Sequence, residues 1–365
     1  MAQGRKGCGC ALAVLAAVVL VGGIMGWRFV VKPYLERQRA EEPPPASGDE
    51  LKVVVLDVGQ GDSILIVAPG GKTVLVDAGE PGDGKRILDA LKRHGVAQID
   101  LLIATHAHAD HIGAADEVIK ATPVGRVLYS GVPNTTKNYE DFLKAIDEKK
   151  IELVRAEPGQ NIEVGGGARL LVLAPIQPFF TKDELRSGGN EPNANSVVTR
   201  LDYGRFSMLL TGDAEAQTED RMIRSGASVR ATVLKVGHHG SKYATSEDLL
   251  KRGEFKTAVI SAGPDNRYGH PSPEVMQRLK AAGVRIYRTD FQGEIVITTR
   301  GKEDDAKFTT AREPKAGEDL WAGREALRDD SARRGFIDFG DLPPAPKPSP
   351  EKSSRANSNR PRAGR

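Results

Sequence analysis

The run from Thr105 to His111, Thr-His-Ala-His-Ala-Asp-His, constrains the fold of this chain more than any other segment. It directly follows the apolar stretch 99–104, which predicts a buried strand. Alternate side chains of an extended chain point to one side, so His106 and His108 share a face, while Asp110 and His111 begin a helix and project into the same space. Imidazoles and a carboxylate that converge at a strand end are typical of a divalent cation site. We therefore expect a fold that gathers further ligands at this strand end.

Cysteine is excluded as a ligand by its position. Cys8 and Cys10 are the two cysteines of the chain, so the residues beyond them offer neither a thiolate nor a disulfide. A metal site there must use imidazole, carboxylate or water. Six of the seven histidines lie in three short clusters, at 106–111, 238–239 and 270.

Two more apolar stretches end on groups of the same kind. Asp213 follows Leu209-Leu210-Thr211-Gly212, where it can bridge two cations or simply cap the next helix. His238 and His239 follow the apolar stretch 233–236. We expect one of these two histidines to be a ligand and the other to hydrogen-bond the site or the substrate.

The segments after these histidines carry weaker signals. Ser241 and Lys242 can hold an anionic substrate, although a turn hydroxyl and a solvated lysine are the default interpretation. His270, in Asn-Arg-Tyr-Gly-His-Pro-Ser-Pro, is a candidate general acid or a contact to a substrate anion, with a structural loop histidine as the alternative.

Hydrophobic periodicity between residues 51 and 300 alternates short apolar strands with amphipathic helices. Strands are predicted at 51–58, 63–67, 72–76, 99–104, 126–129, 151–155, 168–174, 196–202, 205–211, 230–236, 256–261, 284–287 and 293–298, and helices at 84–94, 111–120, 139–149, 214–225 and 273–282. This mixture predicts an α/β fold in which two sheets pack together with helices outside.

The ends of the chain differ from this central part. Residues 7–27 carry no charge and are long enough to span a bilayer, so we predict a membrane anchor at 1–31, with a cleaved signal peptide as the rival interpretation. The proline-containing stretch 32–50 predicts a linker, and 301–365 a disordered, basic and proline-rich tail. Basic residues after the apolar run favour a cytoplasmic position for the following domain.

Charge does not identify a partner. Basic and acidic residues are equal in number over 51–300, so no global basic surface indicates nucleic acid. A local groove formed by Lys235, Lys242 and Arg267 is hidden from such a count. The basic tail 342–365 can contact anionic lipid or nucleic acid, or can simply be solvated.

In their order, these motifs resemble those of metallo-β-lactamase fold hydrolases, and more narrowly the hydrolase domain of ComEC-type DNA-uptake proteins. The resemblance covers nearly all of 51–300 and implies a four-layer αββα sandwich on the extracytoplasmic side of a membrane. The segments that carry it are 56–63, 76–79, 106–111, 193–196, 211–213, 238–241, 268–271 and 288–290.

The same resemblance implies a site with two metals. His106 and His108 would hold the first, Asp110 and His111 the second, with Asp213 bridging and His238 completing the second site. It implies catalytic roles for Asp110, His239 and His270, substrate contacts from Ser241, Lys242 and Asn195, and positions for Asp57, Asp62 and Asp77 from which they orient the ligands.

One departure from the family pattern affects the choice of metal. Typical members place a third histidine on the first metal, but here Asn193 or Asn195 occupies that stretch. A site with fewer histidines accepts manganese more readily, so two Zn²⁺ or two Mn²⁺ ions are both expected cofactors.

The function implied is metal-assisted hydrolysis, in which water acidified by the cations attacks an electrophilic centre. The leading hypothesis is a membrane-anchored phosphodiesterase, a nuclease with DNA or another phosphodiester as substrate. One alternative is a hydrolase of a small ester, lactone, thioester or β-lactam. Another is a metal-stabilised binding module without activity.

Overall fold

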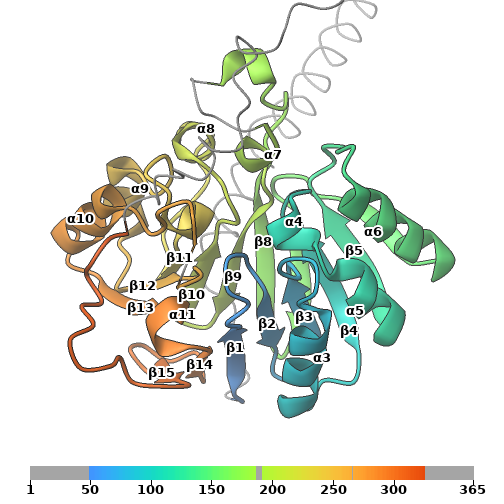
Figure 1. Ribbon diagram of the computed structural model, residues 1–365, viewed down its shortest axis with the longest axis horizontal. Helices are drawn as coiled ribbons and strands as arrows, with labels where there is room; N and C mark the ends of the chain where they lie inside the picture. The colour runs from blue at the N-terminus through green and yellow to red at the C-terminus, as the bar shows by residue number, and fades with distance from the viewer. Residues whose placement is uncertain (1–48, 186–190, 265, 325–365) are drawn as a thin grey trace, which may run out of the picture. The chain divides into compact units, whose positions relative to one another are not determined.

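The computed structural model describes residues 49–185, 191–264 and 266–324, and its strands form two sheets (Figure 1). In order across sheet A, the strands are β15 (Lys307–Thr310), β14 (Ile295–Thr299), β1 (Leu51–Val55), β2 (Ile64–Val67), β3 (Thr73–Val76), β4 (Ile99–Ala104), β5 (Val124–Tyr129) and β6 (Glu152–Arg155). Across sheet B they are β13 (Arg285–Arg288), β12 (Thr257–Ile260), β11 (Val233–Lys235), β10 (Phe206–Leu210), β9 (Val198–Tyr203), β8 (Ala168–Ala174) and β7 (Asn161–Gly165).

Helices connect or follow these strands. The α-helices are α3 (Gly84–Arg93), α4 (Ala109–Ile112), α5 (Ala115–Ala121), α6 (Lys137–Glu148), α7 (Glu191–Ala194), α8 (Ala216–Arg224), α9 (Glu247–Gly253), α10 (Pro273–Ala281) and α11 (Thr289–Gln292). Two short 3₁₀ helices are η2 (Lys182–Glu184) and η3 (Gly237–Gly240).

The two sheets are built to the same plan. In sheet A, β1, β2 and β3 pair antiparallel, and β3 to β6 then run parallel. In sheet B, β8, β9 and β10 pair antiparallel, and β10 to β13 then run parallel. Parallel strands need crossover segments, and the intervening helices lie in these. The carboxyl ends of the parallel strands in each sheet therefore share one edge.

Three apolar clusters give the molecule four layers. Inner-face residues of both sheets, such as Ile66 and Met208, form one cluster. A second packs the outer face of sheet A against α3 and α6 through residues such as Phe142, and a third packs sheet B against α8 and α10 through Leu279. Figure 1 shows α3, α5 and α6 on one side of the sheets and α9 and α10 on the other. The αββα sandwich is confirmed.

Local chemistry explains several element boundaries. The β2–β3 hairpin turns at Pro69-Gly70-Gly71, where the Gly71 N–H donates to the Ala68 carbonyl. Helix α10 begins after Ser272, whose hydroxyl accepts from the Val275 N–H, and Pro273 occupies the first helical position.

The predicted helix 111–120 is interrupted at Gly113. A Cβ there would lie 2.3 Å from the Pro81 backbone nitrogen, so the chain passes close to the loop after β3. The Gly113 N–H donates to the Gly79 carbonyl, and the Ala78 N–H donates to the His111 carbonyl. These bonds tie α4 to the end of β3, which a helical pattern alone does not reveal.

The predicted end of the domain at residue 300 is too early. Strand β15 pairs antiparallel with β14, and Phe308 stacks on Tyr287 at 4.7 Å between ring centroids. This edge strand is only half-buried, so its hydrophobic periodicity is weak. Strand β7 and helix α9 are also absent from the sequence prediction because both are short and carry few apolar residues.

The predicted anchor at 1–31 and nearly all of the linker at 32–50 lie outside the described residues, as does the tail beyond residue 324. Among the helices of the described ranges, none is both long and apolar enough to cross a membrane.

Candidate metal centre

The loop after β4 and the short helix α4 bring the first group of histidines together. His106 and His111 are buried, and His106 Nε2 lies 3.0 Å from His108 Nδ1. Gly61 helps to place α4, because its φ of +139° brings its backbone against the Asp110 carbonyl, which a Cβ would approach to 2.4 Å. The Asp62 N–H donates to that same carbonyl.

Asp213 is the link between the two halves of the molecule. It follows β10 of sheet B, and its Oδ1 lies 3.2 Å from Nε2 of His111, which follows β4 of sheet A. Its Oδ2 lies 3.8 Å from His106 Nε2 and 3.6 Å from His238 Nε2. Gly212 allows this approach, because at φ +51° it packs against Thr105, which a Cβ would meet at 2.8 Å. One buried carboxylate therefore faces both groups of histidines.

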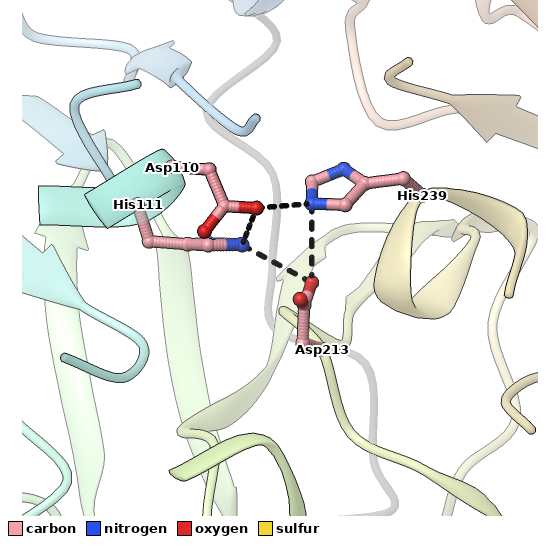
Figure 2. Close-up of side chains that lie close together, drawn as sticks. All are labelled: Asp110, His111, Asp213 and His239. Atoms are coloured by element: carbon pink, nitrogen blue, oxygen red, sulfur yellow. Dashed lines mark ion pairs between the residues drawn. The ribbon is translucent and has the colours of Figure 1, made fainter. Parts of the chain in front are cut away.

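His239 points toward Asp110 and Asp213 (Figure 2), and His238 is not among the four residues whose ligand atoms lie close together. His239 Nε2 lies 3.3 Å from Asp110 Oδ2 and 3.6 Å from Asp213 Oδ1. Asp110, His111, Asp213 and His239 each offer one ligand atom, all within 4.8 Å of one another. We call these four residues the metal cluster.

The hydrogen bonds of the metal cluster fit a divalent cation. Among the described residues, His111 Nε2, Asp213 Oδ1 and His239 Nε2 are buried without a hydrogen-bond partner. His111 Nδ1 bonds Asp77 Oδ2 at 2.8 Å, and His239 Nδ1 bonds the Ser261 carbonyl at 3.0 Å. A proton held on each Nδ1 leaves the Nε2 lone pair directed at the centre, as metal-binding histidines require.

The electrostatics of the metal cluster also favour a cation. Burial opposes ionisation of Asp213, yet His111, His239 and His238 outweigh it and hold its pKa well below the usual value. Burial likewise lowers the pKa of His111, but Asp213, Asp77 and Asp110 raise it well above normal. These carboxylates favour positive charge on the buried His111 ring. For the same reason they would stabilise a divalent cation that takes the place of the second ring proton.

His106, His108 and His238 lie beside the metal cluster. Burial, reinforced by His111, lowers the pKa of His106 well below normal, so its ring is neutral and able to act as a ligand. Asn193 Nδ2 lies 3.2 Å from His238 Nε2, and the buried Asn193 Oδ1 has no partner among the described residues. Glu215 Oε1 lies 3.5 Å from His238 Nδ1.

The backbone is strained at three of these residues. Asp77, His238 and His239 have φ values of +61°, +48° and +53°, in the left-handed region that residues other than glycine rarely adopt. Such conformations cost about 1–3 kcal/mol each and concentrate at functional sites. The strain at 238–239 turns the two neighbouring imidazoles in different directions.

The three predicted orienting carboxylates differ in their contacts. Asp77 binds His111 and also accepts from the Thr105 N–H and hydroxyl. Asp62 Oδ1 lies 3.6 Å from His239 Nδ1, and its Oδ2 pairs with Lys235 Nζ at 2.8 Å. Asp57 accepts from the Gly59 N–H at 3.4 Å.

Three predicted substrate contacts are placed differently from one another. Asn195 is buried, and its amide bonds the Phe180 N–H, the Phe180 carbonyl and the Glu191 carbonyl. Both of its N–H donors are therefore used within the protein, and neither is left for a substrate. Ser241 is buried and its hydroxyl accepts from the Tyr243 N–H, whereas Lys242 is exposed.

His270 lies near the histidines of the centre, with its ring centroid 5.3 Å from that of His238 and 6.4 Å from that of His239. Burial, reinforced by those two imidazoles, lowers the pKa of His270 to about 3. At neutral pH its ring is therefore neutral. Its predicted role as a general acid or as a contact to a substrate anion stays a prediction.

Lys235 lies in the interior and not on the surface, where the sequence suggested a basic groove. It does not line a surface groove, because it is fully buried and paired with Asp62 beneath His239. A lysine within the apolar stretch Val233-Leu234-Lys235-Val236 was the available signal, since a buried lysine requires a carboxylate partner. Thr105 and Glu215 were missed as well, and their contacts follow only from the packing of the two sheets.

Known proteins are similar in sequence to this chain over about two thirds or more of its length. The chain is 34% identical over 269 residues to ComE operon protein 3 of Bacillus subtilis (strain 168), covering 69% of this chain and 33% of that protein. It is 33% identical over 251 residues to Recombination protein 2 of Haemophilus influenzae, covering 67% and 28%, and 28% identical over 296 residues to Competence protein ComA of Neisseria gonorrhoeae, covering 78% and 38%. The chain spans about a third of the length of these relatives.

A family model described as the metallo-beta-lactamase superfamily matches residues 56–263, from the end of β1 to the loop after β12. This range is more than half of the chain and contains all four residues of the metal cluster. The chain therefore belongs to the metallo-beta-lactamase superfamily of metal-dependent hydrolases.

Proposed function

We propose that this chain is a metal-dependent phosphodiesterase that cleaves nucleic acid, and that residues 7–31 anchor it to a membrane. The observation that carries the proposal is the metal cluster, whose buried ligand atoms lack other partners while the side chain of Asp110 is partly exposed. The relatives support nucleic acid as the substrate, because two of their names refer to competence and recombination.

In this proposal the chain holds two cations, Zn²⁺ or Mn²⁺. Asp110, His111, Asp213 and His239 would hold one of them, and His106 and His108, which lie beside Asp213, would hold the other. A divalent cation supplies Lewis acidity and lowers the pKa of water towards neutrality. Asp77 and the Ser261 carbonyl fix the Nδ1 protons of His111 and His239, so that both Nε2 atoms stay directed at the cation.

The substrate approaches from the side of Asp110 and His238. Their side chains are 25% and 22% exposed, whereas those of His111, Asp213 and His239 are at most 1% exposed. His238 therefore takes the role of substrate contact, and His239 that of a ligand, which reverses the assignment implied by the sequence resemblance. The exposed Lys242 can pair with a phosphate oxygen.

The test uses the full chain, recovered from the membrane fraction after an alkaline wash and purified without chelator. Metal content is measured first. Cleavage of single-stranded and double-stranded DNA is then followed with added Zn²⁺ or Mn²⁺, in wild type and in Asp213→Asn. Asp89→Asn is the matched control, because Asp89 forms an exposed ion pair with Lys85 on α3. We expect metal-dependent cleavage that Asp213→Asn reduces at least a hundredfold and Asp89→Asn leaves unchanged.

Each other result contradicts a defined part of the proposal. Bound metal without cleavage of any nucleic acid would exclude the nuclease and direct the search to lactones and thioesters. A purified chain that binds no metal would exclude the site itself. Recovery of the chain from the soluble fraction would exclude the anchor.

A further inference from the structure

Two large apolar side chains are exposed in the described part of the chain, and both lie in the loops of the candidate site. Tyr243 is 47% exposed and Tyr268 is 50% exposed. Tyr243 follows His239 by four residues, and Tyr268 precedes His270 by two. A single exposed tyrosine is ordinary, but two in the loops that carry site histidines indicate a surface that a ligand covers.

Aromatic rings connect Tyr268 to the metal cluster. The Tyr268 and His270 rings stack with centroids 5.8 Å apart and an interplanar angle of 25°. His270 stacks in turn on His239 at 6.4 Å and 26°. His239 Nε2 belongs to the metal cluster. The stacked rings of Tyr268, His270 and His239 therefore connect the exposed surface with the proposed position of the reacting phosphate.

The Asn266 side chain makes hydrogen bonds on both sides of Tyr268. Asn266 accepts from the His270 N–H at 2.9 Å through Oδ1. Its Nδ2 donates to the carbonyls of His270 at 2.6 Å and Gly263 at 2.8 Å. Tyr268 is therefore carried by a segment, 266–270, whose two ends the Asn266 side chain joins.

A cation accompanies each exposed tyrosine. The Arg267 guanidinium lies 5.2 Å from the Tyr268 ring centroid, and its Nη2 donates to the Tyr268 hydroxyl at 3.2 Å. Lys242 Nζ lies 5.2 Å from the Tyr243 ring centroid. Aromatic faces for bases combined with cations for phosphates are the means by which proteins bind single-stranded nucleic acid.

We propose that these four residues bind a single strand of nucleic acid, with the base next to the reacting phosphate stacked on Tyr268. Tyr243 offers a second stacking surface, and Arg267 and Lys242 pair with flanking phosphates. Bases in a duplex already stack on each other and are not free to cover a tyrosine, so single strands and frayed ends bind in preference to duplexes. This inference rests on the proposed function, because it names the form of the substrate at the same site.

Binding is measured apart from cleavage, with the full chain in the presence of chelator. The probes are a fluorescent single-stranded oligonucleotide, a hairpin duplex of the same sequence, and an abasic strand with the same number of phosphates. Base stacking predicts that Tyr268→Leu raises the Kd for the single strand on the order of tenfold, and the Kd for the abasic strand hardly at all. Tyr268→Phe keeps the ring and retains wild-type affinity.

The charged residues are tested through salt dependence. Arg267→Gln should reduce the slope of log Kd against log salt by about 0.7, the value for one phosphate contact on a single strand. Lys144→Gln is the matched control, because Lys144 forms an exposed ion pair with Glu148 on α6. An equal change in both variants would show that the effect is one of net charge and would contradict the assignment of Arg267.

The outcomes separate this inference from the proposed function. If the chain cleaves DNA and Tyr268→Leu binds single strands like wild type, the stacking surface is wrong and the nuclease stands. If Tyr268 governs single-strand binding but no cleavage occurs, the inference stands and the nuclease is wrong. Equal affinity for the duplex and the single strand in wild type would also overturn the inference.

Discussion

At the scale of single residues, the metal cluster depends on the atoms behind its ligands. Asp77 illustrates this, because it adopts φ +61° and places one carboxylate against both His111 and Thr105. The carboxylate fixes the ring orientation and the tautomer of His111, and it makes Nε2 a more basic metal ligand. Asp57, which sequence alone groups with Asp77, instead accepts from the nearby Gly59 N–H.

This difference yields a prediction about metal affinity. Asp77→Asn removes the charge behind His111 at nearly constant volume, so we expect Zn²⁺ or Mn²⁺ to bind about 10–100-fold more weakly. Asp57→Asn, the matched control, should bind like wild type. Competition with a chromophoric chelator measures both constants, and equal weakening in the two variants would contradict the role of Asp77.

At the scale of elements, the turn from β13 into α11 holds the chain that follows the last strand. Arg288 is fully buried and pairs with Asp290, with Nη2 and Oδ2 2.7 Å apart. It also donates to the Leu320 carbonyl, while Arg324 pairs with the same Asp290 oxygen. The Arg324 N–H donates to the Pro271 carbonyl, beside His270. The 288–290 motif therefore holds residues 320–324 next to the loop that carries His270.

Removing the shared carboxylate should be costly. Asp290→Ala leaves the buried Arg288 guanidinium without its carboxylate, so the free energy of unfolding should fall by about 3 kcal/mol or more. Asp220→Ala is the control, because Asp220 pairs with Arg224 on α8 where both side chains are exposed, and we expect a loss below about 1 kcal/mol. Urea denaturation followed by circular dichroism compares the two variants. Similar losses would mean that the buried pair is not a major source of stability.

At the scale of the whole molecule, the metal cluster exists only when both sheets are packed. Asp110 and His111 come from the chain after β4 in sheet A, whereas Asp213 and His239 come from segments after β10 and β11 in sheet B. Strand β15 and residues 320–324 complete this packing, although they lie beyond the domain end predicted from sequence.

Shortening the chain tests this boundary. A chain that ends after residue 324 keeps β15 and the contacts of Arg288, so its Tm should match that of the full chain. A chain that ends after residue 300 exposes part of β14 and loses those contacts, and we expect its Tm to fall by about 5–10 °C. Differential scanning calorimetry measures both, and equal Tm values would show that residues 301–324 do not stabilise the domain.

Much of the fold and part of the site follow from sequence because they depend on local spacing. Strand periodicity identifies the buried strands, and the two-residue and helical spacings of 106–111 direct four side chains to one place. Asp213 and the histidine pair at 238–239 each follow a strand, which predicts that they meet at the sheet edges. The weak edge strands β7 and β15 escaped prediction because exposure removes the apolar pattern on which such a prediction depends.

The class of the fold, the type of ligands and the strand ends at which they gather can therefore be predicted from the order of residue types. The packed structure shows that His239, and not His238, is one of the four residues of the metal cluster, since left-handed backbone at both residues separates neighbouring side chains. It also shows that Lys235 is buried against Asp62 and that Asn195 bonds the Phe180 backbone. Each of these outcomes depends on contacts between residues far apart in the chain or on the backbone conformation. The spacing of residue types encodes neither.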